Sequence, residues 1–236
     1  MRYVHSTLCQ ALDQAVDDGA VPRNVARQLR PRDLPRLPGA ASRPAAHALS
    51  PGALGRFLEA ARTDWLAALW LLVARTGLRR GEALALVWSA DDWRAGTLTV
   101  ARSRSGGGLQ AGGPKTSAGL RTIELSAAVL AALRAHWAAQ AQERLRAGRA
   151  YAEHELVFHA RWGTPLVPRN VLRRFKQLAA HAGLSSAAYV HDLRHTAISH
   201  QLAAGVALPE VSAAAGHANP AVTTAVYAYW VRRAGA

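Results

Sequence analysis

The chain has 236 residues, half of them hydrophobic, which is enough for one large domain or one domain with a smaller appendage. Its formal net charge of +14 points to nucleic acid, an anionic membrane or the ribosome as a partner. No stretch approaches the roughly 20 apolar residues of a membrane span, and the first ten residues lack the apolar core of a signal peptide, which disfavours a membrane. The single cysteine, Cys9, excludes an internal disulfide and a cysteine-rich zinc site, so a reducing cytoplasm fits best. A zinc site built from histidines stays open.

The first 49 residues divide into a helix and a linker. Leu8, Leu12 and Val16 repeat at helical spacing, and Gly19 follows where a helix C-cap is expected. Residues 30–49 are rich in Pro, Arg and Ala without periodicity, which predicts an extended basic linker. We therefore expect a helical segment over 1–29, a linker over 30–49 and a main domain over 50–236.

The main domain is predicted to be mainly α-helical, with a small antiparallel β-sheet. The sheet is expected from two short β-like runs, 97–101 and 122–125, with Gly-rich sequence between them. The helix at about 64–75 is apolar on all sides, Trp65 included, and should be buried. Apolar periodicity and capping residues predict helices at about 51–61, 64–75, 81–86, 126–147, 168–182, 190–204, 208–215 and 219–230, and a buried stripe of Leu130, Leu133, Trp137 and Ala141.

Two segments of this domain carry charged residues at suggestive positions. In TGLRRGE, residues 76–82, Arg79 and Glu82 are three apart and share a helical face, so they either pair or form a solvated helix start. In GGPKTSAGLRTIEL, residues 112–125, Lys115 lies near the tip of a Gly-rich hairpin. From there a lysine either reaches into a DNA groove or remains solvated.

Two later segments carry histidines. In HDLRHT, residues 191–196, His191 and Arg194 together can hold a phosphate and manage a proton, whereas His191 and His195 have the spacing of a helical zinc pair. A core histidine beside a surface charge is the third alternative. His217 then follows a glycine and precedes Tyr227 and Tyr229, and a tyrosine either attacks phosphorus or packs in a core.

The order of these residues is more specific than any one of them. Arg, Lys, HxxR, GH and Tyr follow one another over residues 79–227, and this order resembles the signature of the tyrosine recombinases of the phage-integrase type. The similar blocks cover residues 50–230, and residues 8–26 are similar to the last helix of that family's core-binding domain. The resemblance implies the family's DNA breaking-rejoining catalytic fold.

The resemblance also implies roles for single residues, matched by motif position. The implied catalytic residues are Arg79, Lys115, His191, Arg194, His217 and Tyr227, with Glu82 in support. The arginines and His217 would neutralise charge on the nonbridging phosphate oxygens, Lys115 would protonate the leaving 5′ oxygen, and His191 would accept the tyrosine proton. Tyr227 is favoured over Tyr229 because its spacing from His217 matches that of the family. The implied product is a 3′-phosphotyrosine formed without metal, cofactor or ATP.

The implied partners are duplex DNA, further copies of the chain in a tetramer on paired DNA sites, and accessory DNA-bending proteins, in a bacterial cytoplasm. One departure is large, because only about one helix of a core-binding domain precedes the linker. This suggests a truncated or decaying element, a fragment, or one part of a split system. Three rival functions follow: a DNA-binding remnant without cleavage, a type IB topoisomerase, and a metallohydrolase using His191, His195 and His217.

Overall fold

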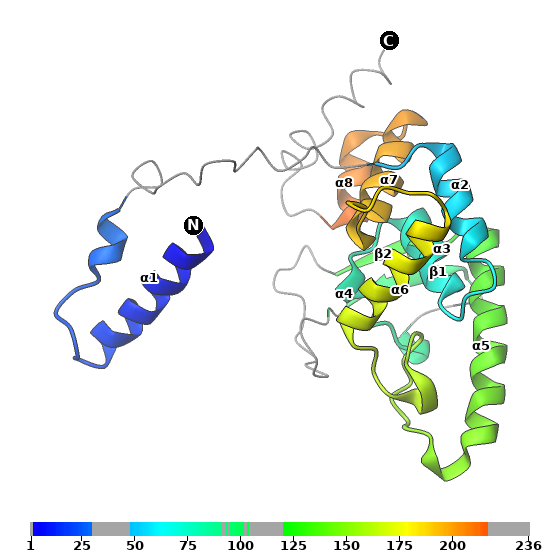
Figure 1. Ribbon diagram of the computed structural model, residues 1–236, viewed down its shortest axis with the longest axis horizontal. Helices are drawn as coiled ribbons and strands as arrows, with labels where there is room; N and C mark the ends of the chain where they lie inside the picture. Colours follow the sequence, from blue (N-terminus) through cyan, green and yellow to red (C-terminus); the bar gives the residue numbers. More distant parts are fainter. Residues whose placement is uncertain are drawn as a thin grey trace. The chain divides into compact units, whose positions relative to one another are not determined.

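The computed structural model describes residues 2–29, 48–90, 93, 95–101, 103 and 120–216. The chain forms two compact units, residues 1–45 and 46–236 (Figure 1). Most of the predicted linker and the predicted helix at 219–230 lie outside the described residues, as do Lys115, His217, Tyr227 and Tyr229.

The described part of the first unit contains α1 (Arg2–Asp17) and the short helix η1 (Val25–Gln28), so the predicted opening helix is confirmed. Asn24 joins the two, because its side-chain amide donates to the carbonyl of Cys9 and to Asp13 Oδ1, both at 2.7 Å. Arg27 forms a bidentate pair with Asp13 at 2.8 and 2.6 Å. These polar contacts fold the chain back on α1 over a short sequence distance.

The described part of the second unit is mainly helical with one small sheet, which confirms the predicted fold class. Strands β1 (Thr97–Val100) and β2 (Arg121–Glu124) pair antiparallel, with Leu98 opposite Ile123. The helices are α2 (Pro51–Ala60), α3 (Ala67–Thr76), α4 (Arg80–Ala83), η2 (Trp88–Ala90), α5 (Ala127–Ala147), η4 (Gly148–Ala150), η5 (Arg161–Gly163), α6 (Pro168–His181), α7 (Val190–Ala203) and α8 (Leu208–Ala215).

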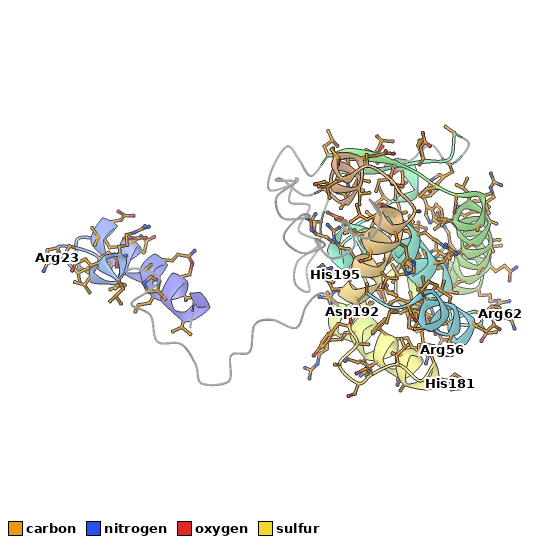
Figure 2. All side chains as sticks on the ribbon, turned by 90° about the horizontal axis from the view of Figure 1, so that it is seen from above. Arg23, Arg56, Arg62, His181, Asp192 and His195 are labelled. Atoms are coloured by element: carbon orange, nitrogen blue, oxygen red, sulfur yellow. The ribbon has the colours of Figure 1, made fainter. Side chains whose placement is uncertain are left out.

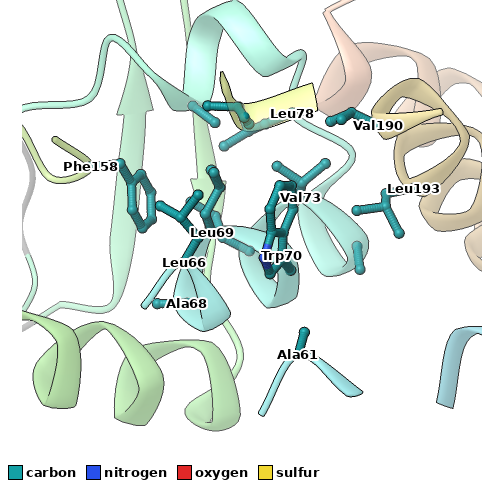
Figure 3. Packing of buried hydrophobic residues seen from close by; sticks show 14 of the residues in the cluster. Ala61, Leu66, Ala68, Leu69, Trp70, Val73, Leu78, Phe158, Val190 and Leu193 are labelled. Carbon is teal, nitrogen blue, oxygen red and sulfur yellow. The ribbon is translucent and has the colours of Figure 1, made fainter. Parts of the chain in front are cut away.

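Helix α3 lies at the centre of the hydrophobic core, packed against α5 and α7. Its Trp70 is fully buried among the apolar side chains shown in Figure 3. The Trp70 ring also contacts Phe57 of α2 and Phe175 of α6, with centroids 6.1 and 5.9 Å away. Aromatic packing of this kind ties three helices together and gives the unit a rigid base.

The structure corrects two expectations about tryptophans. Helix α3 begins at Ala67 and Trp65 is 52% exposed, because the Asp64 carboxylate accepts the Leu66 N–H and the Trp70 indole N–H and holds a turn before the helix. Trp137 of α5 is 54% exposed, because the buried residues of that helix are Val129, Leu133 and Gln140. The predicted stripe therefore lies slightly to one side of the true one.

Hydrogen bonds join Leu49, just before α2, to side chains of α7. The N–H of Leu49 donates to Thr196 Oγ1 at 2.8 Å, and His200 Nε2 donates to the Leu49 carbonyl at 3.1 Å. Ser50 then caps α2, as predicted, by accepting the Ala53 N–H at 3.2 Å. Over the residues that the structure describes, no helix combines the length and apolarity needed to cross a membrane.

Candidate active site

The turn after α3 places Arg79. Gly77 closes that helix in the left-handed conformation at φ +70°, which suits glycine, and its N–H donates to the Val73 carbonyl at 3.0 Å. Arg79 is extended and precedes the first residue of α4. Its side chain is 41% exposed, so the guanidinium lies at the surface edge of the core.

Glu82 holds Arg79 at two points. One carboxylate oxygen accepts the backbone N–H of Arg79 and the other accepts its Nη1, both at 2.8 Å. Glu82 is itself only 5% exposed. The predicted pairing of these residues is confirmed, and the alternative of a solvated helix start is wrong.

A second arginine, Arg121 of β2, reaches the same carboxylate. Its Nη2 and Nη1 donate to the two oxygens of Glu82 at 2.8 and 3.3 Å, and its side chain is 8% exposed. Sequence reasoning missed this residue. The available signal was strand alternation, because Arg121 shares a face with the buried Ile123, and a buried arginine needs a carboxylate partner.

The two arginines keep Glu82 ionised. Burial by itself raises the pKa of a carboxyl group, but the hydrogen bonds and charge of Arg121, with the bonds from Arg79, outweigh it and leave the Glu82 pKa below its ordinary value. Two guanidinium groups therefore share one negative charge, and the cluster stays positive.

Helix α8 ends against three arginines. Three successive backbone carbonyls there accept hydrogen bonds from arginine side chains. The Ala214 carbonyl accepts from Arg121 Nε at 2.6 Å, that of Ala215 from Arg194 Nη2 at 2.7 Å, and that of the C-cap Gly216 from Arg79 Nη2 at 2.9 Å. The carbonyls at a helix C-terminus lack intrahelical partners and carry partial negative charge, so cations stabilise them. We call Glu82, the three arginines and these carbonyls the arginine cluster.

Arg194 enters the arginine cluster from α7. It is 2% exposed, and its Nη1 also donates to the Gly77 carbonyl at 2.6 Å. Arg194 thus links the end of α8 with the turn on which Arg79 lies. The arginine is buried while His191 is exposed, which is the reverse of a core histidine beside a surface charge.

The two histidines of α7 touch each other. The rings of His191 and His195 lie edge to face with centroids 4.6 Å apart, and Figure 2 shows His195 and Asp192 on this helix. Asp192 caps α7 by accepting the Tyr189 N–H at 2.7 Å. Within the described ranges, no three His, Cys, Asp or Glu residues are grouped so that they could hold a metal ion.

Of the predicted site residues, the structure brings Arg79, Glu82 and Arg194 together at the end of α8, and it places His191 on the helix that carries Arg194. Lys115, His217 and Tyr227 lie outside the described residues. In the sequence, His217 comes directly after Gly216, whose carbonyl the arginine cluster holds.

Comparison with known proteins covers most of the chain. The profile of the phage integrase family matches residues 49–230. An integrase from Streptomyces ambofaciens is 32% identical over 244 residues, covering 98% of this chain and 60% of the relative. A XerC-like tyrosine recombinase from Caldanaerobacter subterraneus is 31% identical over 185 residues, covering 72% of this chain and 47% of the relative. The chain thus spans about half the length of these relatives.

Solved structures share the fold. The Tn1549 transposon integrase, in complex with a circular intermediate DNA, superposes with a TM-score of 0.72 at 19% identity, over 99% of this chain and 77% of that chain. The XerA recombinase gives a TM-score of 0.62 at 24% identity, over 86% of this chain and 65% of that chain. The fold is therefore that of tyrosine recombinase catalytic domains.

Proposed function

Because the chain belongs to the phage integrase family, we propose that it is a tyrosine-type site-specific recombinase, which cleaves and rejoins DNA through a 3′-phosphotyrosine without metal or ATP. The observation that carries the proposal is the arginine cluster. It concentrates positive charge at the end of α8, next in sequence to His217. A positive cluster on a rigid base is what a phosphodiester needs when charge develops on its nonbridging oxygens.

The proposed reaction assigns a step to each matched residue. The Tyr227 hydroxyl attacks the phosphorus and forms the new P–O bond, while its proton passes to His191. The bond from phosphorus to the 5′ oxygen breaks, and that oxygen takes a proton from Lys115.

Charge on the phosphate is handled by the arginines and His217. Arg79 is the more exposed arginine, and its bonds to Glu82 and Gly216 among the described residues use two of its five N–H donors, so others remain to meet a phosphate. Arg194 is bound to two carbonyls and buried, so its contribution rests on fixed positive charge beside the phosphate.

The partners belong to the same proposal. We propose that the chain binds duplex DNA and acts as a tetramer on paired sites, with accessory DNA-bending proteins where the sites require them. The net charge of +14 supports DNA binding. Residues 1–29 are proposed as part of a core-binding domain, 30–49 as a linker and 50–236 as the catalytic domain.

A nicked suicide substrate tests the chemistry. The chain is mixed with labelled duplex whose nick lets the short fragment with the free 5′ hydroxyl diffuse away after cleavage, so the covalent adduct accumulates and is seen on a denaturing gel. We expect an adduct that forms equally well in EDTA, that peptide mapping assigns to Tyr227, that is absent in Tyr227→Phe and that persists in the matched control Tyr229→Phe. Label on Tyr229, or cleavage that only added metal restores, would contradict the assignment.

A DNA-binding protein without cleavage is the second candidate, because the net charge of +14 supports DNA binding by itself. The same assay separates the two. Salt-sensitive DNA binding with no adduct on any nicked substrate would support the second candidate, whereas an adduct lost in Tyr227→Phe at unchanged DNA affinity supports the recombinase.

A further inference from the structure

We propose that Arg121 is a positioning residue of the active site, which fixes Arg79 and the end of α8 at Gly216 without touching DNA itself. The proposal rests on the proposed function and adds to it a residue that is not among the matched catalytic positions or Glu82. The juxtaposition that carries it is one buried guanidinium bound both to the carboxylate that holds Arg79 and to the end of α8.

Burial excludes a direct role at the phosphate. The Arg121 side chain is 8% exposed, against 41% for Arg79. All three of its nitrogens donate within the protein, two to Glu82 and Nε to the Ala214 carbonyl. Arg121 therefore acts through the groups it binds.

The first of these groups is Glu82. Its two oxygens accept from Arg121 and from Arg79 together, so Arg121 sets the plane of the carboxylate on which Arg79 rests. Without Arg121 the carboxylate would rotate toward its remaining partner, and the Arg79 guanidinium would follow. A shift of about 1 Å in a catalytic group is enough to slow a reaction by roughly 100-fold.

The second group is the end of α8. Gly216 is left-handed at φ +67°, and a Cβ built there would lie 2.5 Å from Arg121 Nη1 and 2.9 Å from its Cζ. The backbone at Gly216 thus packs directly against the Arg121 guanidinium. The hydrogen bond from Arg121 Nε to the Ala214 carbonyl holds the last residues of α8 that precede this glycine. Arg121 therefore fixes the end of α8 at Gly216, the residue that precedes His217 in the sequence.

The geometry requires arginine and not merely a cation. A bidentate pair with Glu82 and a third bond from Nε need a planar fork, which lysine lacks. Arg121→Lys keeps the charge beside Glu82 and so limits the loss of stability, while it removes the fork. Arg62→Lys is the matched control, because Arg62 is 70% exposed and pairs only with the equally exposed Glu59 among the described residues.

The test compares both variants in the full chain on the nicked substrate. For Arg121→Lys we expect a roughly 100-fold slower single-turnover adduct formation. We also expect DNA affinity within about twofold of wild type, because the variant removes neither charge nor a phosphate contact. Arg62→Lys should match wild type in both.

A methylphosphonate at the scissile position separates positioning from general damage. It removes the negative charge that Arg79 and His217 neutralise, so the defect of Arg121→Lys should shrink on it. An equal defect on both substrates together with a lowered melting temperature would overturn the proposal, since a purely structural role predicts that result. Wild-type rates on the normal substrate would overturn it as well.

A measurement on His217 keeps this inference separate from the proposed function. Its imidazole NMR signals, assigned by their loss in His217→Gln, should move in Arg121→Lys and stay in place in Arg62→Lys. If the wild-type chain forms no adduct, the recombinase proposal fails, and these signals still decide on Arg121. Unmoved His217 signals would overturn the positioning role.

Discussion

The chain contains two pairings of a carboxylate with arginine that differ in their surroundings. Asp13 and Arg27 pair at 2.6 Å in the first unit with side chains 34% and 68% exposed, whereas Glu82 and Arg121 pair at 2.8 Å in the second unit with side chains 6% and 8% exposed. Water can replace the first pairing at little cost, but neither partner of the second can recover its hydration if the other is lost. Ion pairs of similar length therefore differ in how much they contribute to stability.

The reach of the contacts differs as well. The polar bonds among the described residues of the first unit join residues no more than 21 apart in sequence, such as His5 and the Ala26 carbonyl. In the arginine cluster, Arg79 bonds a carbonyl 137 residues away and Arg121 one 93 residues away. The cluster thus exists only when the whole second unit is folded, whereas the first unit depends on local contacts.

Glu82→Gln should give the largest effect, because it breaks the buried pairing and leaves Arg121 and part of Arg79 without a counter-charge. Removing one partner of a buried ion pair costs about 3–5 kcal/mol. We expect that loss in the free energy of unfolding of the second unit, measured by urea denaturation with tryptophan fluorescence at pH 7. Retained stability would show that water or another group compensates the arginines.

Acid should have a related effect on the wild-type chain. The folded-state pKa of Glu82 lies below its unfolded value of about 4.3, so its contribution to stability is present above that value and is lost as the pH falls through the folded-state pKa. Over this range the urea midpoint of Glu82→Gln should change less with pH than that of wild type. Parallel pH profiles would assign the acid sensitivity to other carboxylates.

Local pattern was sufficient for most elements of the second unit. Helical periodicity and capping signals such as Ser50 and Gly77 lie within a few residues of the helices that they delimit, and they predict α2 and the end of α3 closely. The predictions that Trp65 and Trp137 are buried were wrong, because apolar composition does not say which side of a helix meets a neighbour.

The site could be predicted only in part, for a physical reason. Arg79 and Glu82 are three residues apart, so one turn of chain is enough to suggest their pairing. Arg121 of β2 shares that carboxylate from 39 residues away, and nothing local in the sequence ties the two. The role of the three carbonyls at the end of α8 could not be predicted either, because every residue has a backbone carbonyl and the sequence does not show which of them accept from side chains.

Asn24→Ala tests the local character of the first unit and should have a smaller effect. Asn24 caps η1 by accepting the Ala26 N–H at 3.0 Å and donates to two oxygens of α1, and losing a cap costs about 1 kcal/mol. Amide hydrogen exchange of residues 26–29 in the full chain should speed up accordingly. Exchange in the second unit should stay unchanged; faster exchange there would show that the units are coupled.

Asp13→Asn is the exposed counterpart of Glu82→Gln, since both exchange a carboxylate for an amide beside an arginine, and its effect should be the smallest. The hydrogen bonds from Arg27 and then Asn24 lower the pKa of Asp13 to about 2, so the carboxylate is charged at pH 7 and interacts with Arg27. Even so, the pair is solvated and screened by salt, and the amide oxygen of the variant can still accept from Asn24. At 0.15 M salt and pH 7 we expect no resolvable change in the exchange rates of residues 26–29.

The variant should differ from wild type only in acid, because a carboxylate with a lowered pKa adds stability above its unfolded pKa of about 3.9 and loses it as the pH falls toward 2. A loss at pH 7 comparable to that of Glu82→Gln would mean that something covers Asp13 in solution, and the contrast between a solvated and a buried pairing would then fail.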